Sequence, residues 1–216
     1  MTYFETELQS LKERLLVMAS RAEASVAHAI EALVQRDDDA ARKVREEDDA
    51  IDQLEKEIDE QAIRLLAKAP LATQLRLIVT TLKIARDLER VGDEATTIAR
   101  RSIELSQEPQ LKPYVDLPRM ADLARGMLND ALEAFVTRDP GRAREVIPRD
   151  REVDALNKQL YRELASFMIE KPSNITRCLN LMTISKALER IADHAKNVAE
   201  DVVYLYEGRD IRHGGG

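Results

Sequence analysis

Cysteine, tryptophan, glycine and proline are all scarce in this chain, and each scarcity excludes a class of protein. The single cysteine, Cys178, has no partner for an intramolecular disulfide, so a disulfide-stabilised fold is excluded. Tryptophan is absent, aromatic residues make up 4% of the 216 residues, and glycine and proline occur seven times each. Such a composition disfavours a β-sheet protein, which would be richer in aromatic and β-branched residues. It favours long helices packed on one another.

Long apolar runs are missing as well. No window approaches the roughly 18 consecutive apolar residues that a membrane span requires. Residues 1–16 read MTYFETELQSLKERLL, with charges where a signal peptide would need its apolar core. The formal net charge of −7 argues against nucleic acid as the main ligand, because phosphate binding needs a basic surface. We therefore expect a soluble, cytoplasmic protein that reaches a membrane only through a partner.

A duplicated motif organises what is present. Residues 86–95 read RDLERVGDEA, and residues 186–195 read KALERIADHA. A shift of 102 also aligns ALVQRD at 32–37 with AFVTRD at 134–139. The join between the copies, SQEPQLKPYVDLP at 106–118, carries three prolines that separate one helix from the next. The chain is therefore predicted to consist of two homologous halves of about 105 residues each.

Capping residues and prolines divide each half into three predicted helices. The six helices are expected to run from about Phe4 to Gln35, from Asp37 or Asp38 to about Lys68, from Thr73 to about Ser106, from near Pro118, from Asp139-Pro140, and from Ser173 to about Glu207. Pro148 is expected to kink or interrupt the fifth helix. The predicted fold is all-α, with two tandem antiparallel three-helix bundles at 1–108 and 114–208 and a disordered tail at 209–216.

Acids four residues apart recur at equivalent positions of the two halves. Residues at i and i+4 lie on the same side of a helix, so each pair forms an edge of two carboxylates. In the third helix of each half this edge avoids the apolar stripe that faces the core. Four carboxylates brought together repel one another, and a hard cation with oxygen ligands would stabilise them; iron, manganese, magnesium and zinc all qualify. The predicted metal ligands are Asp48, Asp52, Glu89, Asp93, Asp150, Asp154, Glu189 and Asp193.

Other interpretations of the same residues stay open at this point. Acid pairs beside Arg86, Arg90 and Arg100 could form a surface ion-pair network, with each link worth a few tenths of a kcal/mol. His194 could be an additional metal ligand or a hydrogen-bonded helical histidine. The sequence has no Glu-x-x-His pair of the helical-bundle di-iron type, and no P-loop, GxSxG, HExxH or dinucleotide-binding glycine pattern. We therefore predict that the protein is not an enzyme. A carboxylate-bridged enzyme, a metal-storage protein and a scaffold without metal remain the alternatives.

The duplicated motif resembles the PhoU family of phosphate-transport regulators. The resemblance rests on DLERVGDEATTIA at 87–99 and ALERIADHAKNVAEDVVYLYEG at 187–208, and on the acidic segments EEDDAIDQLEKEI at 46–58 and RDREVDALNKQL at 149–160. It covers nearly the whole chain. Glu94 occupies the position where the family motif commonly has the histidine of "DHA".

What the resemblance implies goes beyond the spacing of the acids. Family members are negative regulators of phosphate uptake and of the phosphate-starvation response. They are thought to couple the ATPase subunit of the phosphate ABC transporter to a membrane-bound sensor histidine kinase. Some bind metal clusters through E(D)xxxD motifs, which here fall on the four acid pairs. No nucleic acid is expected as a partner, and assembly as a homodimer stays open.

Overall fold

The computed structural model describes residues 3–69, 71–209 and 211, and this part of the chain forms helices without any strand. The long helices are α1 (Tyr3–Gln35), α4 (Ala72–Ser106), α5 (Asp116–Thr137) and α8 (Ile175–Glu207). The others are α2 (Asp38–Glu47), α3 (Asp49–Leu66), α6 (Pro140–Val146) and α7 (Asp150–Glu170), with 3₁₀ turns η1 (Ile147–Arg149) and η2 (Pro172–Asn174). The predicted all-α fold is confirmed.

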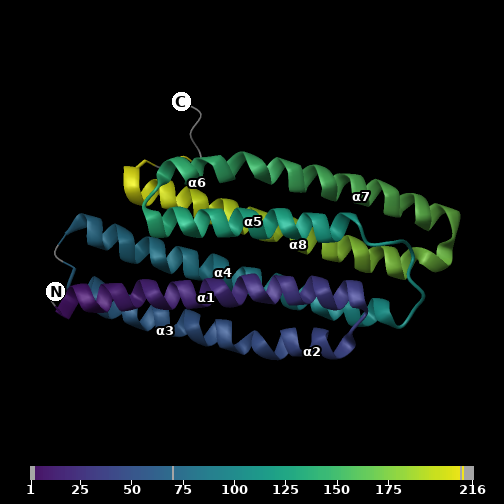
Figure 1. The fold of residues 1–216 in the computed structure, drawn as a ribbon, viewed down its shortest axis with the longest axis horizontal. Coiled ribbons are helices and arrows are strands. Elements are labelled where there is room, and N and C mark those ends of the chain that lie inside the picture. Colours follow the sequence, from purple (N-terminus) through teal and green to yellow (C-terminus); the bar gives the residue numbers. More distant parts are fainter. Residues whose placement is uncertain (1–2, 70, 210, 212–216) are drawn as a thin grey trace.

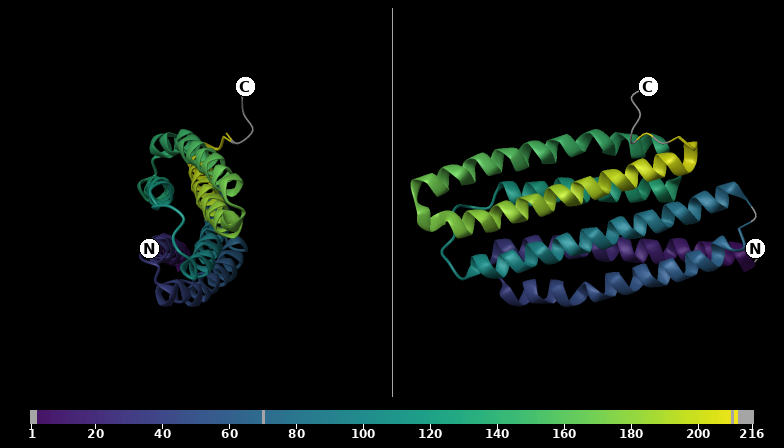
Figure 2. Two further views of the ribbon diagram at one scale, coloured as in Figure 1. Left: turned by 90° about the vertical axis from the view of Figure 1, so that its right-hand side faces the viewer. Right: turned by 180° about the vertical axis from the view of Figure 1, so that it is seen from behind.

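The helices form two elongated bundles that lie side by side (Figures 1 and 2). The first bundle contains α1 to α4, and the second contains α5 to α8. Helices α4 and α8 pack against each other along the seam, with Lys83 Nζ 3.2 Å from Asp201 Oδ1 and Arg190 Nη1 3.1 Å from Glu94 Oε1. These pairings run in opposite directions along the two helices. The equivalent helices of the two halves are therefore antiparallel neighbours.

The second predicted helix of each half is interrupted at the same place in the repeat. In the second half, Pro148 lies in η1, between α6 and α7, which confirms the predicted break. In the first half the helix is interrupted at Asp48, between α2 and α3, although no proline is present there. The interruption is common to both halves, and it falls at the first acid of one acid pair, Asp48, and directly before the first acid of the other, Asp150.

The residues at the N-termini of the helices explain several of the helix boundaries. Asp37 and Asp139 are the N-caps of α2 and α6, and each side chain accepts hydrogen bonds from two backbone N–H groups of the following turn. Pro140 occupies the first turn of α6, where its missing N–H costs no helical hydrogen bond. The predicted cap at Thr73 is wrong. Helix α4 begins one residue earlier, and its N-cap, Leu71, has no side-chain cap bond.

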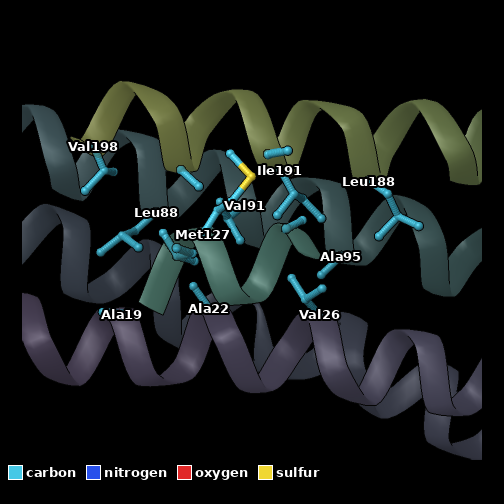
Figure 3. Packing of buried hydrophobic residues seen from close by; sticks show 14 of the residues in the cluster. Ala19, Ala22, Val26, Leu88, Val91, Ala95, Met127, Leu188, Ile191 and Val198 are labelled. Carbon is cyan, nitrogen blue, oxygen red and sulfur yellow. The ribbon is translucent and has the colours of Figure 1, made fainter. Parts of the chain in front are cut away.

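The core runs through both bundles, and Figure 3 shows residues of α1, α4 and α8 meeting at the centre of the molecule. The stripes that the sequence predicted to face inward are fully buried in both third helices. They comprise Ile84, Leu88, Val91, Ala95 and Ile98 on α4, and Ile184, Leu188, Ile191, Ala195 and Val198 on α8. Small residues such as Ala19 and Ala22 let α1 approach its neighbours closely (Figure 3).

Within the described residues, no helix is both long enough and apolar enough to cross a membrane. The predicted disordered tail falls mostly on residue 210 and residues 212–216, which lie outside the described part of the chain. The predicted domain boundaries, 1–108 and 114–208, stay predictions.

Candidate functional site

The first acidic site lies where α3 packs on α4. Asp48 stands at the break between α2 and α3, and Asp52 follows in the first turn of α3. Glu89 and Asp93 project from α4, with Glu89 half-buried and Asp93 exposed. Asp48 lies very close to the backbone of α4, since a Cβ placed on Gly92 would come within 2.7 Å of Asp48 Oδ1. A glycine at this position therefore provides the space that the carboxylate occupies.

Asp48 lies near enough to two of the other predicted carboxylates of this half for their charges to act on it. Burial raises the pKa of Asp48, and the negative charges of Asp52 and Asp93 raise it further. The hydroxyl of Thr96 lies close enough to offset part of this rise, although it forms no hydrogen bond within the described part of the chain. Asp48 Oδ1 is nevertheless buried without a hydrogen-bond partner among the described residues. A buried, unpaired carboxylate oxygen that faces further acids is an unfavourable arrangement unless a cation joins it.

Glu89 is perturbed in the same direction, and its surroundings reveal an acid that the sequence analysis missed. Burial raises the pKa of Glu89, followed by the charge of Asp93, while Arg90 opposes the rise. Glu55 of α3 also raises the pKa of Glu89, and its own pKa is raised by burial and by neighbouring acids. Glu55 follows Asp52 by three residues and so shares its side of the helix. That spacing was the signal that could have identified it.

The second acidic site lies at the equivalent place, between α7 and α8. Asp150 is buried at the start of α7, and its Oδ1 has no hydrogen-bond partner among the described residues. Burial raises the pKa of Asp193 on α8, and the charges of Asp150, Glu189 and Asp154 raise it further. The charges of the other three predicted carboxylates of the second half therefore all act on Asp193.

Cationic side chains distinguish the second site from the first. Lys196 Nζ donates a hydrogen bond of 3.1 Å to Asp150 Oδ2, and this lysine stands where the first half has Thr96. Lys186 forms an ion pair with Glu189. In the first site, Arg90 forms the ion pairs: its Nε lies 3.4 Å from Glu89 Oε2, and its Nη1 lies 3.6 Å from Asp93 Oδ2. The first site is therefore less well neutralised by the protein itself.

The carboxylates are close enough to interact but do not yet converge on one point. Within residues 3–69, 71–209 and 211, no three histidine, cysteine, aspartate or glutamate side chains are arranged to hold a metal ion. Several of these acids are paired with basic side chains instead, Glu89 and Asp93 with Arg90 and Glu189 with Lys186. The oxygen donors have the chemistry that a hard cation prefers. Small side-chain rotations, however, would be needed to bring them together.

His194 and Cys178 are engaged elsewhere in the structure. His194 Nδ1 lies 2.8 Å from Asp87 Oδ1 across the seam between α4 and α8, so it is a hydrogen-bonded helical histidine. Cys178 is fully buried near the start of α8, and burial raises the pKa of its thiol. The reactive thiolate is therefore disfavoured, and Cys178 packs as a small core residue.

Comparison with known proteins shows which family this chain resembles. A family model described as "PhoU domain" matches the chain twice, over residues 15–102 and 117–202. The phosphate-specific transport system accessory protein PhoU homolog of Pseudomonas putida is 42% identical over 214 residues, which cover 98% of this chain and 84% of that protein.

The chain belongs to the PhoU family.

Two solved PhoU structures share its fold. The crystal structure of PhoU from Pseudomonas aeruginosa superimposes with a TM-score of 0.92 at 41% identity, covering 95% of this chain and 100% of that one. The phosphate transport system regulatory protein PhoU from Streptococcus pneumoniae gives a TM-score of 0.90 at 28% identity, covering 96% and 99%. Each of the two PhoU domain matches contains one of the acidic sites, so the family repeat and the duplicated carboxylates coincide.

Proposed function

We propose that this chain is the accessory protein of a phosphate-specific transport system, and that it acts in the cytoplasm as an adaptor without catalytic turnover. It would hold a sensor histidine kinase in its signalling-off state when phosphate is plentiful, by contacting the kinase and the ATPase subunit of the transporter together. The observation that carries this proposal is the double family match over nearly the full length, together with relatives named as phosphate-specific transport accessory proteins.

Metal ions bound by the carboxylates would give the adaptor a defined shape. In the first bundle, Asp48 and Asp52 would join Glu89 and Asp93, fixing α3 to α4. In the second, Asp150 and Asp154 would join Glu189 and Asp193, fixing α7 to α8. A bound cation would neutralise the mutual repulsion of these acids. The unpaired buried oxygens of Asp48 and Asp150 support this proposal.

The two sites would not be equal. Lys196 already neutralises part of the charge on Asp150, whereas Thr96 offers Asp48 only a neutral hydroxyl. A cation entering the second site must displace or tolerate an ammonium group, which opposes binding through like-charge repulsion. We therefore expect the first bundle to bind metal more tightly than the second.

A metal-dependent enzyme or a storage protein fits the described residues less well. Turnover on a carboxylate cluster needs a general base beside an open substrate position, and storage needs a cavity to hold the ions. The histidine nearest the second site, His194, is occupied by Asp87. A role in fixing helix positions asks only for the ligands that are present.

The metal role is tested by elemental analysis of protein purified without a histidine tag. Asp93→Ala/Asp193→Ala is compared with the wild type, and Asp122→Ala, an exposed acid on α5, is the matched control. We expect the double variant to lose bound metal and the control to retain it. Equal metal content in all three proteins would show that these acids are not the ligands.

The adaptor role is tested separately in cells. A strain that lacks the protein is complemented with the wild type or with Asp93→Ala/Asp193→Ala, and a phosphate-starvation reporter is measured in phosphate-rich medium. The wild type should silence the reporter. Full induction with the wild-type protein present would refute the regulatory role, whereas silencing by the double variant would refute only the contribution of metal.

A further inference from the structure

The same arginine of the repeat adopts an unusual backbone conformation in both halves. Arg36 and Arg138 directly precede the capping aspartates of α2 and α6, and they have φ angles of 58° and 59°. This left-handed region is uncommon for any residue other than glycine, because Cβ approaches the following carbonyl. Two such residues at equivalent positions bring two guanidinium groups to opposite ends of the seam between the bundles.

At one end, where α4 ends on the right in Figure 1, Arg36 bonds to backbone carbonyls of the chain. Arg36 Nη2 donates hydrogen bonds to the carbonyl oxygens of Leu105, Ser106 and Glu108, at distances from 2.5 to 3.2 Å. It therefore caps the C-terminus of α4, whose last carbonyls lack helical partners. Nearby, Arg177 Nε lies 3.3 Å from Glu108 Oε2, so the charge of this second arginine is paired with a carboxylate.

The opposite end of the seam has no such pairing. A pocket of about 270 Å³ opens there, between the start of α4 and the end of α8. Its lining consists of Lys12, Thr73, Gln74, Arg76, Leu77, Arg138, Leu205 and Tyr206. None of these residues is acidic. Among the described residues, Lys12, Arg76 and Arg138 form no ion pair with a carboxylate, whereas Arg177 at the other end pairs with Glu108.

The charges in this pocket act on one another. Burial lowers the pKa of Lys12, and the positive charge of Arg138 lowers it further. The position equivalent to Lys12 in the second half is Tyr114, so the ammonium group is particular to this end. Three cations that share one pocket without a counter-charge repel one another, and an anion between them would remove that repulsion.

We propose that this pocket binds a small, multiply charged oxyanion of the phosphate type, as the free ion or as the phosphate group of a small ester. Guanidinium groups match the geometry of phosphate oxygens, and Thr73 adds a hydroxyl donor. A volume of about 270 Å³ is below that of pockets for drug-sized ligands, which favours a compact anion. The three positive charges favour phosphate over a singly charged carboxylate.

The position of the pocket gives the anion a structural role. Lys12 and Arg76 belong to the first bundle, and Arg138 belongs to the second, so one anion would contact both bundles at once. Arg76 and Glu89 lie on the same helix, roughly 20 Å apart along its axis, so the pocket is separate from the acidic sites. The inference does not depend on the adaptor role or on bound metal.

Calorimetric titration of the full-length protein with inorganic phosphate tests the proposal. Metal is stripped with a chelator first, and the chelator is then removed by desalting, because both metal and chelator would interfere with anion binding. We expect saturable binding at one site per chain at low ionic strength. Arg76→Gln and Arg138→Gln should each weaken it about tenfold or more, because each removes a charged hydrogen-bond donor.

Two control variants separate the pocket from general charge effects. Arg119→Gln removes an exposed cation that pairs with Glu152 at 3.0 Å, and Arg36→Gln removes the equivalent arginine at the other end of the seam. Both should leave phosphate affinity unchanged, and Arg119→Gln should do so without loss of stability. If Arg119→Gln weakens phosphate binding as strongly as Arg138→Gln does, the assignment of the pocket is wrong.

A second titration with glycerol 3-phosphate distinguishes the two sources of the anion. Tighter binding of the ester would assign the pocket to a small organic phosphate, and tighter binding of the inorganic ion would assign it to free phosphate; either result supports the proposal. Absence of saturable binding for both ligands, or binding that neither Arg76→Gln nor Arg138→Gln weakens, would refute it.

Discussion

Replacing Asp48 by asparagine should make the metal-free protein more stable, although it removes an ionised residue. Asp48 Oδ1 is buried without a hydrogen-bond partner among the described residues, and the charges of Asp52 and Asp93 oppose its ionisation. Leaving a buried polar group unsatisfied costs about 1–3 kcal/mol, and more when the group is charged. Asparagine keeps the shape and the unsatisfied oxygen but removes the charge. We therefore expect the free energy of unfolding to rise by about 1 kcal/mol.

That gain should appear as an increase in melting temperature of about 2–4 °C for a chain of this length. Differential scanning calorimetry of metal-stripped protein at about pH 7 measures it. The exposed acid Asp122, which pairs weakly with Arg125 at 3.9 Å, provides the matched control. Asp122→Asn should change the stability by less than about 0.5 kcal/mol.

The pH dependence of this difference follows from the direction of the pKa shift. Because the pKa of Asp48 is raised in the folded state, the folded protein binds the proton more tightly than the unfolded chain does. The penalty is complete above the raised pKa, and it is lost as the pH falls through that value and below the ordinary value of 3.8. The advantage of Asp48→Asn should therefore shrink as the pH is lowered from about 7 towards 4.

Added metal should reverse the order of the two proteins. A cation that binds the folded state stabilises the wild type by mass action, and Asp48→Asn should gain less because it lacks one charged ligand. If Asp48→Asn and Asp122→Asn have the same stability at neutral pH without metal, the Asp48 carboxylate is not under the strain that its surroundings indicate. The same result would remove one of the reasons for placing a cation there.

Three further substitutions test separate parts of the structure. Gly92→Ala should lower metal affinity in the first bundle, because its Cβ would lie 2.7 Å from Asp48 Oδ1 and displace that carboxylate. Helix propensity favours alanine by about 1 kcal/mol, which offsets the cost of this close contact, so the melting temperature should change little. Unchanged metal affinity in a titration would contradict the argument. Arg36→Gln should lower the free energy of unfolding by about 2 kcal/mol in urea denaturation, because the carbonyls at the end of α4 lose their charged donor. A variant as stable as the wild type would show that water caps these carbonyls equally well. Lys83→Met should lower the free energy of unfolding by about 2 kcal/mol in the same assay, because Asp201 is 3% exposed and loses the ammonium group 3.2 Å from its Oδ1. An unchanged free energy of unfolding would mean that the other contacts of Asp201 are sufficient.

Helix content and the repeat were predictable because they depend on local patterns. The apolar stripe of α4 repeats every three or four residues, and it is fully buried as that period requires. Asp37 and Asp139 cap their helices through hydrogen bonds that span only two or three residues, so neighbouring sequence was sufficient to identify them. The cap predicted at Thr73 failed because α4 begins at Ala72 with no side-chain cap at all.

The acidic edges were predictable one helix at a time, but their surroundings were not. Spacing places Glu89 and Asp93 on one side of α4, yet it cannot show that Asp48 lies against Gly92 of the neighbouring helix. The neutralisation of Asp150 by Lys196 also depends on how α7 and α8 pack, because the two residues are far apart in the sequence.

The sequence by itself determined an all-helical protein of two homologous halves, with four carboxylates in each half, since helical periodicity and repetition are encoded in the order of residues. Tertiary structure decided the break of the chain at Asp48, the engagement of His194 with Asp87, and the gathering of Lys12, Arg76 and Arg138 in one pocket. Each of these depends on the antiparallel packing of α4 on α8 and of neighbouring helices on them. The sequence of one helix does not specify which residues of a neighbouring helix will lie opposite it. Which charges stay unpaired can therefore be determined only from the packing of both helices.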